Sequence, residues 1–351
     1  MSNPPPVNGW IILDKPRGLG STQAVSAVKR NLREAGYNMK LKGGLKVGHG
    51  GTLDPLAEGV LPIAIGEATK LTGRLLDASK IYDFTIRFGE ETDTLDAEGE
   101  VVATSDMRPT LEQVAEVLAG FTGPIEQVPP AFSALKVDGK RAYDLARAGE
   151  QVKLATRAVT VFALEILPGT GRGTSEAGGG APSASSSLAG QDWPPVPLHH
   201  PADGPPPRAG EDLEEVTLRA HVSKGTYIRS LARDIAHALG TCGHVTYLRR
   251  IKAGPFSQTQ AISLDKLNEI GKGARLEDLL LPLEAGLDDI PALSLDPDSA
   301  QAVRQGRVIS GLPHADGLYC AYRGKTPVAL MELSGGTAKV VRGFNLPDVA
   351  E

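Results

Sequence analysis

The sequence predicts an α+β protein with a large first domain and a small β-rich domain at its C-terminal end. Two observations support this fold class. Strand-like runs and amphipathic helical patterns follow one another over most of the chain, separated by turns rich in Gly, Pro and Asp. From about Leu293 the pattern changes to one short helix and three short β-type runs. We therefore predict a first domain over residues 9–290 and a second over residues 291–346.

The first predicted strand is Gly9–Leu13, and Pro16 ends it because the proline ring fixes its own φ and keeps Lys15 extended. A helix should follow with Ser21 or Thr22 as its N-cap. It has an apolar stripe, and a glycine stands at its expected end. The stripe consists of Ala24, Val25, Val28 and Leu32, and the glycine is Gly36.

The middle of the chain continues with an alternating strand at Tyr82–Phe88, whose partner is expected to begin at Gly99. Thr110 and Gln113 have the spacing of a capping box, which predicts a helix ending near Gly120. Later elements are two β-rich runs, a helix stopped by a glycine, and a further strand. They are Val159–Ile166, Val216–Val222, the helix containing Leu231, Ile235 and Leu239 with Gly240 after it, and Val245–Ile251.

Residues 169–215 lie between two β-rich runs and have an unusual composition. Of these 47 residues, 28 are Gly, Pro, Ser or Ala, and almost no apolar periodicity is left. Such a segment cannot bury enough apolar surface to offset its ordering entropy. We therefore interpret it as a flexible insertion in a hairpin loop, and not as a domain boundary.

Charge is unevenly distributed along the chain. The net charge is −5, and the insertion alone carries seven acidic and two basic residues, so the rest is neutral. Basic residues cluster in 15–46, with eight Lys or Arg and one acid, and in 216–257, with seven and one. These clusters could follow a phosphate backbone, or they could be ordinary solvated helix faces.

No targeting or metal-binding signal is apparent. No apolar run approaches the roughly 18 residues that span a bilayer, and residues 1–10 do not have the pattern of a secretory signal. Cys242 and Cys320 are far apart and form no CxxC pair, which favours a reducing cytoplasm. The histidines show no metal-ligand spacing, and no GxxxxGK[ST] or GxGxxG motif suggests a nucleotide cofactor.

Asp54 is the first candidate for chemistry. A glycine-rich approach and the following Pro55 would hold its carboxylate in one direction. The alternative is that Asp54 caps a turn, as Asp-Pro pairs often do. Arg229 opens a helix after a Gly-Thr-Tyr turn and could pair with a carboxylate, or it could be a surface or phosphate-binding residue. Tyr82 and Tyr227 could stack on a base, or lie at the edge of the core.

Six stretches together resemble one known family, the bacterial tRNA pseudouridine-55 synthases of the TruB type. They occur in the family's order over most of residues 9–257, and the C-terminal domain resembles the family's RNA-binding PUA domain less specifically. The stretches are Leu13–Pro16, Val47–Pro62, Gly89–Asp96, Gln127–Ala134, Ser223–Arg229 and Tyr247–Arg250.

The resemblance implies a mixed-sheet catalytic domain that flips a uridine out of the T-stem-loop of tRNA and isomerises it. It implies no cofactor, no obligate protein partner and a monomer. The carboxylate would start the reaction at C6 of uracil, at C1′ of the ribose, or by removing the 2′ proton. The residues implied are Asp54 and Arg229 as the catalytic pair, Tyr82 stacking on the base, Leu248 lining the pocket, His49 holding flipped-out nucleotides, and Lys15 with Pro16 shaping the cleft.

The resemblance leaves alternatives and one departure. A non-catalytic tRNA-binding or tRNA-folding module, or the guide-dependent synthase of ribonucleoprotein particles, would share many of the same features. Residues 129–157 carry six Lys or Arg and three acids, and we expect them to form a mobile loop over the RNA. Position 50 is Gly where the family usually has Thr, so a local hydrogen bond would be lost there.

Overall fold

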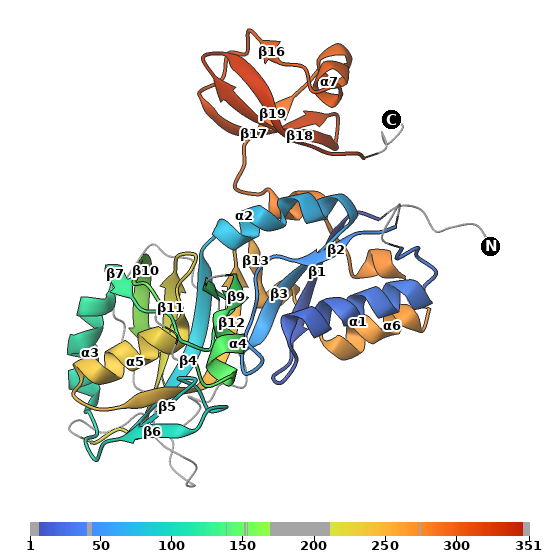
Figure 1. The fold of residues 1–351 in the computed structure, drawn as a ribbon. Coiled ribbons are helices and arrows are strands. Elements are labelled where there is room, and N and C mark those ends of the chain that lie inside the picture. Colours follow the sequence, from blue (N-terminus) through green and yellow to red (C-terminus); the bar gives the residue numbers. More distant parts are fainter. Residues whose placement is uncertain are drawn as a thin grey trace.

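The computed structural model describes residues 7–40, 44–137, 139–150, 152, 154–168, 211–273 and 275–346. The first domain is built on a ten-stranded mixed sheet, shown across the lower part of Figure 1. Its strands are β1 (Gly9–Lys15), β2 (Val47–His49), β3 (Glu58–Ile65), β4 (Lys80–Phe88), β7 (Gly123–Gln127), β10 (Arg157–Ile166), β11 (Glu215–Val222), β12 (Gly243–Ala253), β13 (Phe256–Ser257) and β14 (Leu281–Pro282).

The sheet consists of two antiparallel halves that meet at one parallel pair. Its order is β14-β1-β3-β12-β4-β11-β10-β7, with β2 paired to β3 and β13 to β12. The parallel contact joins β3 to β12 through only two register pairs, Glu58 with Arg249 and Gly59 with Arg250. The first half of β12 therefore extends past the start of β3 and lies beside the loop that precedes β3.

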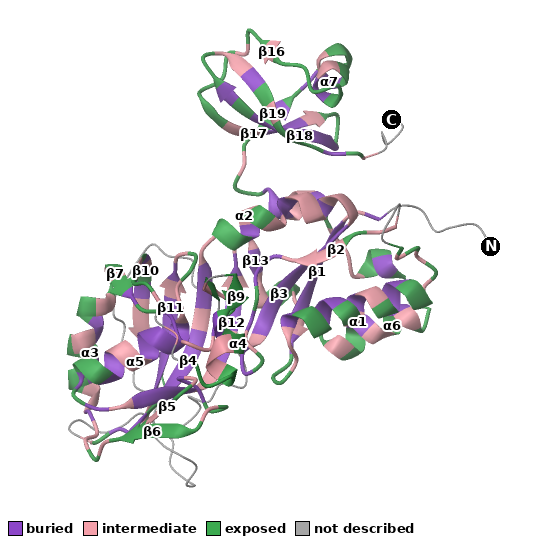
Figure 2. Cartoon of the chain, viewed as in Figure 1, coloured by how far each residue is buried: buried purple, intermediate pink, exposed green. Residues whose placement is uncertain are grey.

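The helices cover the sheet and explain the two-sided burial of the central strands. They are α1 (Ser21–Glu34), η1 (Gly66–Leu71), α2 (Thr72–Asp77), α3 (Leu111–Leu118), α4 (Ala142–Arg147), α5 (Ile228–Ala238) and α6 (Leu264–Gly271). Buried residues line both faces of the central strands (Figure 2). In β1, Ile11 and Leu13 belong to the core cluster that includes residues of α1 and α5, whereas Trp10 and Ile12 belong to the cluster that includes residues of η1 and α2. This alternation is why β1 is an unbroken apolar run.

Most predicted elements are confirmed, but two details are wrong. Gly20, and not Ser21 or Thr22, is the N-cap of α1. The strand after Gly99, β6 (Val101–Thr104), pairs with β5 (Glu90–Thr92) in a separate exposed hairpin, while β4 pairs with β11 and β12. Sequence alternation identifies a strand but does not choose its partner.

The sequence predicts that the insertion ends at residue 215, but residues before 215 already belong to the packed domain. Residues 169–210 lie outside the described residues, but Leu213 is fully buried and its amide donates to the carbonyl of Pro109. Glu215 already belongs to β11, which forms the predicted hairpin with β10. Likewise, part of the predicted loop 129–157 is ordered secondary structure: β8 (Lys136–Val137), β9 (Lys140–Arg141) and α4.

The C-terminal residues form a second, five-stranded sheet with one helix, in the order β15-β17-β18-β19-β16. This sheet has a separate apolar core, which includes Ala300 and Val303 of the helix. None of the helices in the described ranges is both long and apolar enough to cross a membrane. The elements are β15 (Ala292–Ser294), α7 (Pro297–Arg304), β16 (Ile309–Ser310), β17 (Gly317–Arg323), β18 (Thr326–Ser334) and β19 (Thr337–Gly343).

Gly59 is required at the parallel junction of the sheet. Its φ is +97°, and a Cβ there would lie 2.3 Å from the carbonyl oxygen of Arg250. We predict that Gly59→Ala lowers the free energy of unfolding by about 2 kcal/mol or more, because the backbone strain and the clash add. Urea unfolding measures it. Gly73→Ala in α2, where a Cβ meets nothing within 4 Å, is the control and should be neutral or slightly stabilising; equal effects of the two substitutions would contradict the prediction.

Candidate active site

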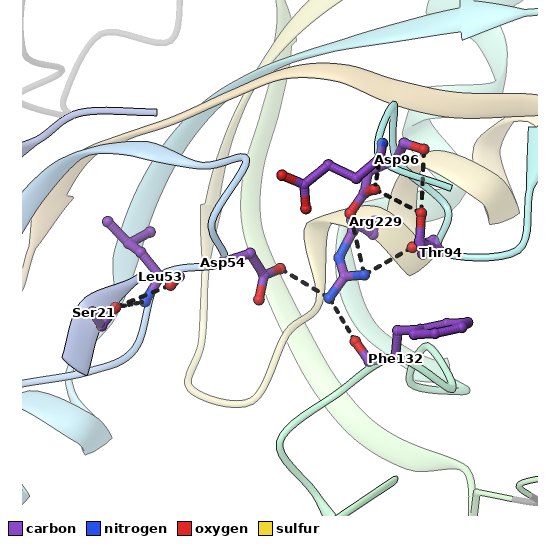
Figure 3. A network of polar contacts seen from close by, with 8 residues as sticks. Ser21, Leu53, Asp54, Thr94, Asp96, Phe132 and Arg229 are labelled. Carbon is purple, nitrogen blue, oxygen red and sulfur yellow. Dashed lines mark hydrogen bonds and ion pairs between the residues drawn. The ribbon is translucent and has the colours of Figure 1, made fainter. Parts of the chain in front are cut away.

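Asp54 lies in the loop between β2 and β3, at the seam between the two halves of the sheet. The loop is anchored from below, because Leu53 and Leu56 are buried in the core shared by α1 and α5. The side chain of Asp54 is 38% exposed, and one carboxylate oxygen lies 2.9 Å from Nη2 of Arg229 (Figure 3). The loop thus presents a single accessible carboxylate on a well-packed base.

Arg229 is the centre of the polar network in Figure 3. It comes from the first turn of α5 and is only 5% exposed. Besides Asp54, its guanidinium lies 3.3 Å from the carboxylate of Asp96 and donates to the carbonyls of Thr94 at 2.8 Å and Phe132 at 2.9 Å. One buried cation therefore fixes two carboxylates and two loops, and the planar fork of an arginine suits this task better than a lysine.

The loop of Asp96 adds further negative charge at the site. The Asp96 carboxylate accepts from the hydroxyl of Thr94 at 2.6 Å and from the amide of Glu98 at 3.0 Å, which fixes its own direction. Burial raises the pKa of Glu98 above its usual value, and the carboxylates of Asp96 and Asp54 add to this shift. The positive charges of Arg17 and Arg229 act against this shift and partly balance the acidic corner.

Two buried cations hold the backbone around Asp54. Lys15 is fully buried, and its ammonium donates to the carbonyls of Leu19 at 2.6 Å, Pro16 at 3.0 Å and Pro55 at 3.4 Å. Burial lowers its pKa to about 8, although the nearby carboxylates of Asp54 and Glu58 oppose the shift. Arg250, also buried, donates to the carbonyls of Gly51, Thr52 and Val60.

A cavity of about 310 Å³ opens beside Asp54. It contains five of the seven residues that the sequence predicts: Asp54, Arg229, Tyr82, Tyr227 and Leu248. Lys15 and His49 do not line it. Lys15 points into the protein, as described above, and His49 lies on β2, where burial and the charge of Arg250 lower the pKa of its imidazole.

The side chain of Gln127 holds Tyr227 at the wall of this cavity. Its amide oxygen accepts from the backbone amide of Tyr227 at 2.8 Å, and its amide nitrogen donates to the Tyr227 carbonyl at 3.1 Å. Burial raises the pKa of the Tyr227 phenol, which keeps this side chain neutral. Tyr82 comes from β4, whose neighbouring inward residue Phe84 is in the core, so both aromatic rings are fixed by rigid elements.

Sequence reasoning missed three residues of the site: Asp96, Lys80 and Arg250. Lys80 lines the cavity, and its ammonium donates to the carbonyls of Leu75, Leu76 and Ala78 at the end of α2. A signal existed for Asp96, which lies in one of the six family-like stretches. The preceding Leu95 has a φ of +62°, a strained conformation often found at functional sites.

A larger cavity of about 690 Å³ lies elsewhere, between α2, the β12–β13 turn and the segment before the second domain. It contains none of the predicted residues. Two of its acidic side chains are in ion pairs, Asp289 with Arg74 of the same lining and Asp77 with Lys224 outside it. The smaller cavity is therefore the candidate active site, because it holds an accessible carboxylate paired with a buried cation. Within the described residues, no group of three His, Cys, Asp or Glu side chains could hold a metal ion.

Two family models match the chain and define the class of protein. The N-terminal domain of TruB family pseudouridylate synthases matches residues 37–175, and the C-terminal domain of tRNA pseudouridylate synthase B matches residues 229–288. The tRNA pseudouridine synthase B of Novosphingobium aromaticivorans is 62% identical and covers 98% of this chain and 100% of its own length. The corresponding protein of Zymomonas mobilis is 50% identical and covers 97% and 96%. The chain belongs to the tRNA pseudouridine synthase B family.

Solved structures share the fold at lower identity. A chain in the structure of an H/ACA RNP bound to a substrate RNA containing 2′-deoxyuridine has a TM-score of 0.63 at 23% identity, covering 97% of this chain and 85% of that one. A Cbf5-Nop10-Gar1 complex gives 0.62 at 24%, covering 95% and 84%. These likenesses concern the fold. The much closer relatives are tRNA pseudouridine synthases, and the comparisons give the non-catalytic alternative no support.

Asp96 generates a prediction about charge balance. Asp96→Asn keeps an oxygen that can accept from Thr94 and Glu98 but removes one of the two negative charges beside Arg229. We expect kcat on a tRNA transcript to fall by roughly 10- to 100-fold, because Arg229 is left under-compensated and shifts. Asp93→Asn in the same loop is the control, since its exposed carboxylate contacts the amide of Glu100 and not Arg229. Similar rates for the two variants would contradict the prediction.

Lys15 generates a prediction about pH. Its pKa is about 8 in the folded protein, below the usual 10.5, so the unfolded chain binds more protons at pH values between these two. Stability rises with pH wherever the unfolded state binds more protons. The free energy of unfolding of the wild type should therefore rise relative to Lys15→Met between pH 8 and 10, by on the order of 2 kcal/mol. Below pH 8 the difference should be constant. Urea unfolding at several pH values measures this. The prediction is wrong if the wild type loses stability relative to Lys15→Met as the pH rises.

Proposed function

We propose that this chain converts uridine to pseudouridine in tRNA, with Asp54 as the catalytic carboxylate. One observation carries the assignment of the residue. Asp54 is the accessible carboxylate of a cavity wall, and its oxygen is paired at 2.9 Å with a guanidinium that is almost fully buried. The ion pair gives the carboxylate of Asp54 a fixed direction at the wall of the cavity.

The reaction suits these residues. It breaks the N–C glycosidic bond and rejoins the same base through a carbon atom, so nothing is oxidised or reduced overall. A positioned carboxylate can start such a reaction as a nucleophile or as a base. Arg229 would hold it in position, Tyr82 would stack on the base, and Leu248 and Tyr227 would complete the wall. Lys15 would act through the loop and not through the RNA, because its ammonium faces carbonyl oxygens.

The substrate uridine is proposed to be position 55 in the T-stem-loop of tRNA. A base inside a stacked loop must be flipped out before it can enter a cavity of this size, at a cost of a few kcal/mol. Phosphate contacts can offset that cost. The segment beside the cavity offers exposed cations and an exposed ring, Tyr143, with the guanidinium of Arg147 over it at 4.4 Å. The exposed cations are Lys136, Lys140, Arg141 and Arg147.

This segment, residues 132–147, is connected to Arg229, the partner of Asp54. Phe132 contacts Tyr143 edge to face, and its carbonyl accepts from Arg229. We propose that His49, at the edge of the Asp54 loop, contacts nucleotides next to the flipped one. We also propose that residues 9–290 form the catalytic domain and residues 291–346 a PUA-like RNA-binding domain, and that the protein acts as a cytoplasmic monomer without an obligate protein partner.

Replacement of Asp54 tests the proposed function. Asp54→Asn keeps the size of the side chain and removes the negative charge, so we expect pseudouridine formation to fall by at least about 1000-fold. Binding of tRNA should change little, since one carboxylate contributes no phosphate contact. Asp106→Asn, at an exposed carboxylate outside the cavity, is the matched control.

Chemical mapping of pseudouridine in a tRNA transcript gives both the rate and the position of the product. The wild type and Asp106→Asn should modify one uridine of the T-loop. A fully active Asp54→Asn variant would refute the assigned nucleophile. Modification outside the T-loop would refute the proposed position but leave the reaction intact.

A further inference from the structure

Ser21 makes an unusual contact with the residue before Asp54. Its hydroxyl donates to the carbonyl of Leu53 at 3.0 Å and accepts from the amide of the same residue at 2.8 Å (Figure 3). Both residues are 4% exposed. A single side chain 32 positions earlier in the chain thus satisfies both backbone polar groups of Leu53.

The hydroxyl is available for this contact because it does not cap the helix. Ser21 is the first residue of α1, and serine at the start of a helix usually accepts from the backbone two or three residues later. Here Gly20 is the N-cap, and its amide donates to the side chain of Gln23 at 2.8 Å. A glycine cap is only a few tenths of a kcal/mol weaker than a serine cap. Moving the serine one position into the helix therefore costs little and directs its hydroxyl across to the loop.

With this contact, the backbone is held on both sides of Asp54. Upstream of Asp54, Ser21 fixes Leu53. Downstream, the carbonyl of Pro55 accepts from the amide of Gly18 at 2.8 Å and from the ammonium of Lys15 at 3.4 Å. Residues 15–21 thus hold the backbone immediately before and after Asp54, while Arg229 holds the carboxylate itself. The direction of the carboxylate depends on all three contacts.

We propose that Ser21 is a positioning residue for the isomerisation, acting through the backbone of Leu53 to aim the Asp54 carboxylate at the bound uridine. The inference rests on the proposed role of Asp54. Without the hydroxyl, a buried amide and a buried carbonyl lose their partner, and the loop must shift to reach new ones. A shift of about 1 Å at a reacting group can cost about 100-fold in rate. Binding of tRNA, which depends on distant phosphate contacts, should not change.

Four variants test this, each measured for kcat, KM, tRNA affinity and thermal unfolding. Ser21→Ala removes the contact. Ser21→Thr keeps a hydroxyl but adds a buried methyl group. Thr85→Val is the matched structural control, because the Thr85 hydroxyl is buried and bonded to that of Thr217 at 2.9 Å without contacting the loop. Asp54→Asn reports on the proposed function itself. Ser21→Cys, which has the same shape and a weaker hydrogen-bonding group, replaces Ser21→Ala if the latter does not fold.

We expect kcat of Ser21→Ala to fall by roughly 30- to 100-fold with KM and tRNA affinity within about twofold of the wild type. Thr85→Val should keep the kcat of the wild type even if its unfolding temperature falls as much as that of Ser21→Ala. Ser21→Thr should be more active than Ser21→Ala, although the added methyl group makes it no more stable. Together these results would separate positioning from general stability.

Three results would overturn the inference. The first is a Ser21→Ala enzyme with unchanged kcat, the second is a loss that appears in KM or in tRNA affinity, and the third is an equal loss of kcat in Thr85→Val. Asp54→Asn distinguishes these failures from a failure of the proposed function. If Asp54→Asn is inactive and Ser21→Ala is not impaired, only the role of Ser21 is wrong. If Asp54→Asn is active, the assignment of the nucleophile is wrong.

Discussion

An arginine that is only 5% exposed would destabilise a protein unless its charge were compensated. In this chain the groups that compensate the charge lie at the candidate active site. Asp54, Asp96 and the carbonyls of Thr94 and Phe132 surround the guanidinium of Arg229. They come from three loops that follow different strands, so the ion network brings those loops to one point. The same contacts that stabilise the buried charge therefore determine where the carboxylate of Asp54, the proposed nucleophile, lies.

The pairing of strands in the sheet determines where this network lies. Because β3 and β12 pair over only two residues, the first half of β12 lies next to the Asp54 loop and contributes Leu248 to the cavity. Arg250, two positions later on the same face, reaches the carbonyls of Gly51 and Thr52 from below. Strand β12 thus provides both a wall of the cavity and a support for the loop. A single junction between two antiparallel halves explains why residues about 200 positions apart act together.

Local sequence patterns predict the elements well and the contacts between them poorly. The capping box at Thr110, the stripe of α1 and three of the five strands of the second sheet, β17, β18 and β19, follow from periodicity and turn chemistry, and the structure confirms them. Asp54 and Arg229 could be singled out because of their turns and the family resemblance. Asp96 lies in a family-like stretch, but its contact with Arg229, like that of Ser21 with Leu53, joins residues more than 30 positions apart, and no local pattern predicts such a contact. The partner of β4 was missed for the same reason, because alternation says nothing about which strands pair.

The glycine at position 50 shows how such distant coupling changes the interpretation of a substitution. The family resemblance predicts that Gly50 loses a hydrogen bond made by the usual Thr. The structure shows instead that a side chain has no room there: a Cβ at Gly50 would lie 2.4 Å from Cδ1 and 2.9 Å from Cβ of Leu75. Leu75 cannot withdraw, because its carbonyl and those of Leu76 and Ala78 are held by the ammonium of Lys80, and its side chain is buried with η1. A larger residue at position 50 therefore requires either a shift of the end of α2 or a smaller residue at position 75. The end of α2 packs against the Asp54 loop through these two positions, so the loop's geometry depends on that helix as well as on α1.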